Sequence, residues 1–270
     1  MRSLEGKVVA ITGAGSGIGQ HLAIELARQG CLLSLAEINP SSMKLTCEML
    51  PENCQYQTST TDVSKKEQVD KFAESTIEKF GHVDVLINNA GVALSQTISD
   101  MDIEEMEWLM NINFWGVVYG CKAFLPHLLK QKEAHIVNTS SVFGLMAVPT
   151  QGAYNASKFA VRGFTEALSQ EMKHTGINVS CVYPGGIKTN IVKHGRYHIG
   201  PDNNEDQDIA ASNFEQMATT TPQRAAQVMI NGILNNRKRI MIGSDSLLID
   251  WLVRLLPTSY EKILSKGLHR

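Results

Sequence analysis

The sequence lacks a large net charge, a cysteine framework and a long apolar run. Its 25 Lys and Arg nearly balance 27 Asp and Glu, for a formal net charge of −2. A nucleic-acid partner requires a dense basic patch, so we expect none. The five cysteines form no C-x-x-C pair, and three of them lie in strand-like segments where a buried thiol is the ordinary outcome. This indicates a reducing, cytoplasmic location rather than a disulfide framework.

Signals for membranes and metals are also weak. Residues 1–7 lack the apolar core of a signal peptide, and no run reaches the length of a membrane span. His194 and His198 have no Cys or paired carboxylates nearby, so we expect no metal site. The C-terminal extension, residues 246–270, is amphipathic. Three roles stay open for it: covering a neighbour's active site, packing in an oligomer or, less favoured, contacting a membrane surface.

Length and apolar content favour one domain. The chain has 270 residues, of which 43% are hydrophobic, and no linker interrupts residues 1–270. Short apolar, β-branched runs alternate with stretches of helical periodicity, which predicts an α/β, Rossmann-like, doubly wound parallel sheet of about seven strands with helices on both faces. Strands are expected near Val8, Leu33, Gln55, Val85, Ile136, Val179 and Ile240, and helices near Leu22, Met43, Val69, Met106, Leu125, Phe164 and Val228.

A glycine-rich turn follows the first expected strand. Residues 7–12 form an apolar run, residues 13–19 read Gly-Ala-Gly-Ser-Gly-Ile-Gly, and a helical pattern comes next. Glycines allow positive φ and a close approach of the backbone to a pyrophosphate, while the helix start offers free N–H groups. The common G-x-G-x-x-G spacing fails because Ile18 occupies its last glycine position. The spacing Thr-Gly-x-x-x-Gly-x-Gly fits instead.

An acid at the end of the second expected strand indicates the cofactor. Glu37 lies 24 residues after Gly13, near the usual place for a carboxylate that accepts the adenosine ribose hydroxyls. Neither Ser16 nor Ile38 offers a positive charge for a 2′-phosphate. We therefore predict that NAD is bound and that NADP binds poorly.

Ser141, Tyr154 and Lys158 are the candidate chemical groups. Tyr154 and Lys158 are four residues apart in a segment, 153–173, whose apolar positions have helical spacing, so both side chains leave one helix face. Ser141 ends a strand-like run thirteen residues before Tyr154. A phenol with a cation beside it and a second hydroxyl nearby suit proton transfer at one substrate oxygen.

With these motifs the sequence resembles the short-chain dehydrogenase/reductase family. The resemblance extends from Lys7 to about Gly243, with the motifs in the order and at the spacings of that family. The motifs are Thr12-Gly-x-x-x-Gly-x-Gly19, Asp62-Val63, Asn88-Asn-Ala-Gly91, Asn113, Ser141, Tyr154-x-x-x-Lys158, and Pro184-Gly185 through Thr189.

The resemblance implies a catalytic tetrad of Asn113, Ser141, Tyr154 and Lys158. Tyr154 is expected to be the acid/base. Because a free phenol has a pKa of about 10, Lys158 and an oxidised nicotinamide would have to stabilise its anion. Ser141 would hydrogen-bond the substrate oxygen. Lys158 would also bind the nicotinamide ribose, and Asn113 would hold a water that relays protons from Lys158.

The same resemblance implies the contacts with the cofactor. Asn88 is left open, because it either joins these contacts or ties neighbouring strands together. The expected NAD contacts are Gly13, Ser16, Gly17, Ile18, Gly19 and Glu37; Asp62 and Val63 along the adenine; Asn89, Ala90 and Gly91 beside the adenosine half; Tyr154 and Lys158; and Pro184, Gly185, Ile187 and Thr189 near the nicotinamide.

The expected substrate region is apolar. Residues 142–149, with Ala93, Leu94 and the loop from Gly186 onward, either line it or only pack beneath that loop. An apolar secondary alcohol or its ketone fits best. A 3-oxoacyl thioester reductase and a catalytically silent cofactor-binding sensor or scaffold stay open as alternatives, although the intact tetrad argues against the silent protein. The sequence names neither the substrate nor the direction of the reaction.

Residues 186–220, the lid segment, are predicted to form a mobile cover over the substrate. Lys188, Lys193 and Arg196 in this segment either bind an acidic substrate or are simply solvated. The helices expected near residues 114–130 and 155–172 correspond to those that the family uses for packing between subunits. We therefore expect a homodimer or homotetramer.

Overall fold

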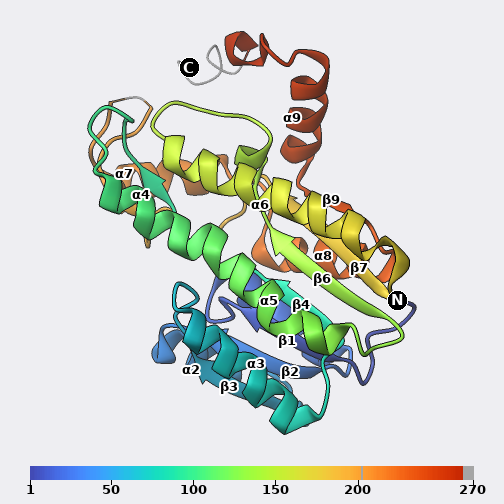
Figure 1. Cartoon of the computed structure of the whole chain (residues 1–270). Coiled ribbons are helices and arrows are strands. Elements are labelled where there is room, and N and C mark those ends of the chain that lie inside the picture. Colours follow the sequence, from blue (N-terminus) through green and yellow to red (C-terminus); the bar gives the residue numbers. More distant parts are fainter. Residues whose placement is uncertain (202, 264–270) are drawn as a thin grey trace.

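The computed structural model describes residues 1–201 and 203–263. Seven parallel strands form one sheet in the order β3-β2-β1-β4-β6-β7-β9 (Figure 1). The predicted α/β architecture is therefore confirmed. The strands are β1 (Val8–Thr12), β2 (Leu32–Glu37), β3 (Tyr56–Thr60), β4 (Val85–Asn88), β6 (Ala134–Thr139), β7 (Ile177–Pro184) and β9 (Arg239–Ile242).

Helices cover both faces of the sheet. The first face carries α1 and α8, and the second carries α3, α5 and α6. The described helices are α1 (Gly17–Arg28), α2 (Pro40–Glu48), α3 (Lys66–Phe80), α4 (Ile103–Met110), α5 (Gly116–Leu128), α6 (Gly152–Glu171), α7 (Gln207–Met217), α8 (Pro222–Leu234) and α9 (Ser244–Leu255).

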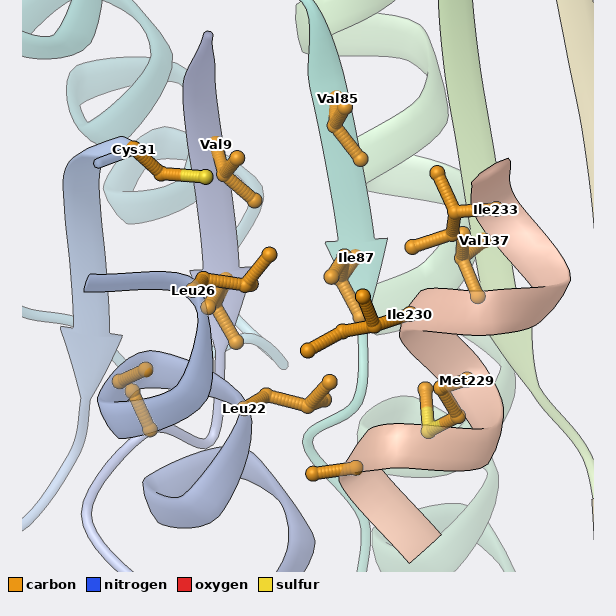
Figure 2. Packing of buried hydrophobic residues seen from close by; sticks show 14 of the residues in the cluster. Val9, Leu22, Leu26, Cys31, Val85, Ile87, Val137, Met229, Ile230 and Ile233 are labelled. Carbon is orange, nitrogen blue, oxygen red and sulfur yellow. The ribbon is translucent and has the colours of Figure 1, made fainter. Parts of the chain in front are cut away.

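The central strands are buried on both faces because their side chains alternate between two cores. In β1, Val9 and Ile11 join one apolar cluster, whereas Val8 and Ala10 join the other. Figure 2 shows the first core, where Leu22 of α1 and Ile230 of α8 point toward one another against the strands. Each such fully buried side chain contributes about 1.5–3 kcal/mol to folding.

The strand order places the functional edge of the sheet. After β1 the chain continues to β2 on one side of the sheet, and after β4 it continues to β6 on the other side. The connections therefore diverge between β1 and β4, which leaves a crevice at the carboxyl ends of these two strands. The glycine turn follows β1, Asn89 follows β4, Ser141 follows β6 and Gly185 follows β7. All of these segments therefore meet at one edge.

The lid segment has more regular structure than expected. It contains β8 (Arg196–Tyr197), which pairs in parallel with β5 (Leu94–Ser95), and it contains α7. Asp202, within the lid segment, lies outside the described residues. A π-helical turn, η1 (Asn111–Trp115), joins α4 to α5 and was not predicted.

The C-terminal extension begins with α9, which follows the edge strand β9. The hydroxyl of Tyr260 accepts a hydrogen bond from the Ala147 N–H at 3.1 Å, so this extension contacts its own chain beside the expected substrate region. Residues 264–270 of the extension lie outside the described residues. Within the described part of the chain, we find no helix with the length and apolarity of a membrane span.

Candidate active site

The glycine turn after β1 is closely packed on both sides. Gly13 has a φ of +66°, and a Cβ there would lie 2.8 Å from the Ala90 Cα. A Cβ at Gly15 would lie 2.7 Å from the Glu37 Cγ. Side chains at these positions would displace the neighbouring loop or the acid. The bare backbone thus forms the kind of cradle that a pyrophosphate requires at the start of α1.

The carboxylate of Glu37 faces this turn. It accepts hydrogen bonds from the N–H groups of Gly15 at 3.0 Å, Ile38 at 3.0 Å and Asn39 at 3.1 Å. Three donors hold one anion at the end of β2, where the adenosine ribose hydroxyls are expected. The position of Glu37 therefore fits the predicted role.

Thr12 organises the turn, although the sequence assigned it no role of its own. Its hydroxyl oxygen accepts the N–H groups of Asn89 and Ala90, both at 3.1 Å. The side-chain amide of Asn89 donates back to the carbonyls of Thr12 and Gly13 at 3.2 Å. These hydrogen bonds attach the loop after β4 to the glycine turn. The threonine that opens the Thr-Gly-x-x-x-Gly-x-Gly spacing was the available signal.

Asp62 and Val63 lie after β3, at the carboxyl-end edge of the sheet where the adenine is expected. The carboxylate of Asp62 accepts both the N–H and the hydroxyl of Ser64, at 2.9 and 2.7 Å. Val63 is buried, and a Cβ at Gly116 would lie 2.9 Å from its Cγ2. Val63 therefore fixes this loop against the start of α5.

Asn88 is structural. Its side-chain amide donates to the Asn138 Oδ1 at 2.9 Å, and the two residues are register partners on β4 and β6. The Asn138 amide donates in turn to the Thr165 hydroxyl on α6 at 3.1 Å. Of the two roles left open for Asn88, the structure supports the one that ties neighbouring strands together.

The loop after β7 lies beside the glycine turn. Thr189 reaches it, since its Cγ2 is 3.1 Å from where a Gly17 Cβ would lie. The carboxylate of Asp245, in the first turn of α9, accepts the Gly186 N–H at 2.6 Å. The Lys188 N–H donates to the Thr220 carbonyl at 2.9 Å. Asp245 thus anchors the expected nicotinamide loop from a distant part of the sequence, a contact that sequence reasoning missed.

Tyr154 and Lys158 extend from α6 into the site. Both are buried, and the Lys158 Nζ lies 5.5 Å from the centroid of the Tyr154 ring. The ammonium donates to the Thr139 carbonyl at 3.1 Å. Ser141 lies close enough to Tyr154 to lower the pKa of the phenol, and its hydroxyl accepts the Phe143 N–H at 3.1 Å. The structure therefore brings the three predicted groups together.

Burial disfavours the charged forms of both Tyr154 and Lys158, so it moves their pKa values in opposite directions. It raises the pKa of Tyr154 to about 12, and the hydrogen bond from Ser141 opposes this only in part. It lowers the pKa of Lys158 to about 8. The predicted stabilisation of the phenolate by Lys158 together with an oxidised nicotinamide stays a prediction.

Asn113 lies in η1 and is fully buried. Its Oδ1 accepts the Val92 N–H at 2.8 Å, and its amide donates to the Val92 carbonyl at 3.0 Å and to the Ser157 hydroxyl at 3.2 Å. The side chain therefore joins the loop after β4 to α6, one residue before Lys158. Its predicted role in a water relay stays a prediction.

The apolar side chains after Ser141 pack in two different places. The Phe143 ring lies 5.9 Å from the Tyr154 ring at 84°, so it contributes to the wall beside the phenol. Leu145 packs instead against Cys181 and Tyr183 beneath the loop. Leu145 therefore fits the packing interpretation, and the lining role of Phe143 stays a prediction.

The lysines of the lid segment, the cysteines and the possible metal ligands are the remaining polar candidates from the sequence. Lys188 and Lys193 are exposed on the lid segment. All five cysteines are free. Among residues 1–201 and 203–263, no three His, Cys, Asp or Glu side chains gather in a way that could hold a metal ion.

Known proteins match this chain over most of its length. A family model for short chain dehydrogenase matches residues 7–198. The putative oxidoreductase SadH of Mycobacterium tuberculosis is 40% identical, covering 99% of this chain and 97% of its own. Estradiol 17-beta-dehydrogenase 11 of Mus musculus is 31% identical, covering 97% of this chain and 84% of its own.

A solved structure shares the whole fold. A short chain dehydrogenase/reductase from Burkholderia phymatum in complex with NAD has a TM-score of 0.86 and 31% identity, with 95% of both chains covered. The family model spans well over half of the sequence, and the glycine turn, Ser141, Tyr154 and Lys158 converge at one edge of the sheet. This chain therefore belongs to the short-chain dehydrogenase family and is an oxidoreductase.

Proposed function

We propose that this protein is an NAD(H)-dependent oxidoreductase that interconverts a hydrophobic secondary alcohol and its ketone. The observation that carries the proposal is a buried phenol, Tyr154, whose ring centroid lies 5.5 Å from the Lys158 Nζ and which packs beside an apolar wall. A proton donor placed in this way suits a carbonyl or alcohol oxygen. When bound, NAD supplies the position that accepts or returns a hydride.

Each polar group has a separate task at the substrate oxygen. Tyr154, whose pKa burial raises to about 12, keeps its proton near pH 7 and donates it to a carbonyl oxygen in the reductive direction. Ser141 hydrogen-bonds the same oxygen as negative charge develops on it. Lys158 adds positive charge nearby, which favours the phenolate that remains after the proton has left.

The proposed cofactor is NAD rather than NADP. Glu37 places a carboxylate, held by three N–H groups, at the ribose end of the glycine turn. The neighbouring Ile38 is exposed and uncharged, so no cation there offsets the carboxylate. A 2′-phosphate would therefore be repelled. The NAD complex of the Burkholderia protein supports the same choice.

The proposed substrate is apolar because the groups around Tyr154 are apolar. Leu94, Leu109 and Ala153 are buried in one cluster with Tyr154, and Phe143 packs against it. The mouse relative is named for estradiol, which supports a hydrophobic alcohol for this chain. The free thiols of this chain support the reducing, cytoplasmic location that we propose.

A substrate panel tests the proposal. The purified protein is mixed with NAD and cyclohexanol, sec-octanol, acetoin or testosterone, or with NADH and the matching ketones, and the NADH absorbance is followed. A carrier-linked 3-oxoacyl thioester is included. We expect turnover of at least one apolar alcohol or ketone and none of the thioester. Turnover of the thioester alone would contradict the substrate class, and no turnover of any compound would contradict the proposed function.

A further inference from the structure

A short ladder attaches the lid segment to the chain that follows β4. β5 and β8 pair in parallel. The Arg196 N–H donates to the Ala93 carbonyl at 3.0 Å, and the His198 N–H donates to the Ser95 carbonyl at 2.9 Å. The Ser95 hydroxyl adds a hydrogen bond to the Ile199 carbonyl at 2.7 Å. This part of the lid segment is therefore docked by its backbone.

The side chain of Arg196 fastens the same segment to α4. Its guanidinium carbon lies 3.9 Å from the centroid of the Trp108 ring, and its Nη1 lies 3.1 Å from the Glu105 Oε1. Because Glu105 and Trp108 are three residues apart, they share one helix face, and a planar guanidinium can stack on the ring while its edge donates to the carboxylate. The guanidinium of Arg196 thus contacts Trp108 and Glu105 of its own chain rather than serving to bind an acidic substrate.

The contacts of Arg196 with Trp108 and Glu105 form a clasp, and Trp108 connects it to the proposed catalytic tyrosine. Its side chain packs against the cluster in which Leu94, Leu109 and Tyr154 are buried. Leu94 also belongs to β5, where it is the register partner of Arg196. Arg196 therefore forms an outer layer over the apolar wall beside Tyr154.

The turn before β8 is held from α7 as well. The side-chain amide of Gln207 donates to the carbonyls of Val192 at 2.8 Å and Gly195 at 3.0 Å. A Cβ at Gly195 would lie 2.7 Å from the Ala93 carbonyl oxygen, so a side chain there would push the turn off the ladder. Backbone contacts fix the turn, and the Arg196 clasp extends that attachment to α4.

We propose that Arg196 is a positioning residue for substrate binding. Its stack on Trp108 and its ion pair with Glu105 hold the lid segment against α4, so that the apolar wall beside Tyr154 is already formed before substrate arrives. This inference rests on the proposed oxidoreductase function.

The clasp has a defined kinetic consequence. Without it, substrate binding must itself order the lid segment, and the apparent affinity falls in proportion to the fraction of molecules in which the segment is still docked. The hydroxyl and ammonium groups of Tyr154 and Lys158 are untouched. Loss of the clasp therefore raises the KM for the alcohol while leaving kcat and the KM for NAD near their original values.

The test compares Arg196→Ala with Arg28→Ala. Arg28 forms a matched ion pair with Glu25 at 3.0 Å on α1, remote from the lid segment. For each protein we would measure KM and kcat with sec-octanol, or with testosterone if it turns over faster, together with amide hydrogen exchange of residues 190–199. A stack and an exposed ion pair together predict about a five- to tenfold rise in alcohol KM and similarly faster exchange in Arg196→Ala alone.

Two further variants separate positioning from general stability. Arg196→Lys keeps the charge but loses the planar stack, so we expect an intermediate KM and intermediate exchange. Trp108→Leu keeps an apolar side chain in the cluster and should match Arg196→Ala.

Unchanged exchange of residues 190–199 in Arg196→Ala would overturn the inference whether or not the protein is active. Faster exchange with an unchanged alcohol KM, or with a loss confined to kcat, would also overturn it. If the unaltered protein turns over no alcohol or ketone, the proposed function fails. The exchange comparison then still decides whether the clasp orders the lid segment.

Discussion

Glu37→Gln isolates the charge that selects the cofactor. The carboxylate accepts the Gly15 N–H through Oε2 and the N–H groups of Ile38 and Asn39 through Oε1. A glutamine oxygen can still accept the bonds at one of these positions, but its NH₂ group turns a donor toward the other. We therefore expect a loss of about 1–2 kcal/mol of folding stability, because a charge-assisted hydrogen bond is replaced by an unfavourable donor pair.

The effect on cofactor choice follows from electrostatics. A 2′-phosphate carries a charge of about −1.5 to −2 at pH 7. One pair of unit charges about 4 Å apart is worth about 1 kcal/mol in bulk water and about 4 kcal/mol near a protein surface. Glu37 is partly buried, between these limits. Removing its charge should thus relieve about 3 kcal/mol of repulsion, which is about a hundredfold in the ratio of kcat/KM for NADP to that for NAD.

The assay measures kcat/KM for both cofactors with one alcohol. The unaltered protein should prefer NAD, and Glu37→Gln should raise the NADP to NAD ratio about a hundredfold, whereas Glu48→Gln should leave it unchanged. Glu48 is an exposed acid at the end of α2. A preference of the unaltered protein for NADP, or an unchanged ratio in Glu37→Gln, would refute the assignment.

Three other predictions concern stability and assembly. Burial lowers the pKa of Lys158 from 10.5 to about 8, so the folded protein binds fewer protons than the unfolded chain in that window. The free energy of unfolding should gain up to about 3 kcal/mol from Lys158 as the pH rises from about 8 to 10.5. Denaturant titrations of Lys158→Met over this pH range should lack the rise. An equal change of unfolding free energy with pH in the parent and in Lys158→Met would contradict the shift. Leu22→Ala, in the core, should cost about 2–5 kcal/mol, against less than about 0.5 kcal/mol for Leu248→Ala on the exposed face of α9, and equal losses in thermal unfolding would count against the packing. We propose that α5 and α6 pack between the subunits of a homo-oligomer. Trp115 is exposed at the end of η1, directly before α5, so Trp115→Glu should lower the mass found by light scattering; a monomeric parent would contradict this.

The fold was predictable because local pattern and tertiary burial agree. Residues 7–12 predicted a buried strand, and all five residues of β1 are buried. The helix predicted over residues 153–173 is observed as α6 (Gly152–Glu171). Once the strands are parallel, their carboxyl ends share one edge, so the motifs that follow them meet in one site. Short-range pattern and one topological rule together located Tyr154 and its neighbours.

The missed features depend on contacts between distant parts of the chain. Asp245 reaches the Gly186 N–H across 59 residues, and Arg196 reaches Trp108 through the fold rather than along the sequence. No local pattern encodes such pairs. The depth of burial of the phenol was missed for a related reason, because a four-residue spacing shows that Lys158 is near Tyr154 but does not show how far burial raises the pKa of Tyr154.

The central claim is that the hydroxyl of Tyr154 transfers the proton, and Tyr154→Phe tests it most directly. The matched control is Tyr183→Phe, which removes the hydroxyl of another buried tyrosine, packed with Leu145 and Cys181 outside the site. Turnover would be measured by NADH absorbance and NADH binding by fluorescence. The account predicts at least about a hundredfold loss of turnover for Tyr154→Phe, with NADH binding retained and the control near the parent. Near-parent turnover in Tyr154→Phe would contradict it.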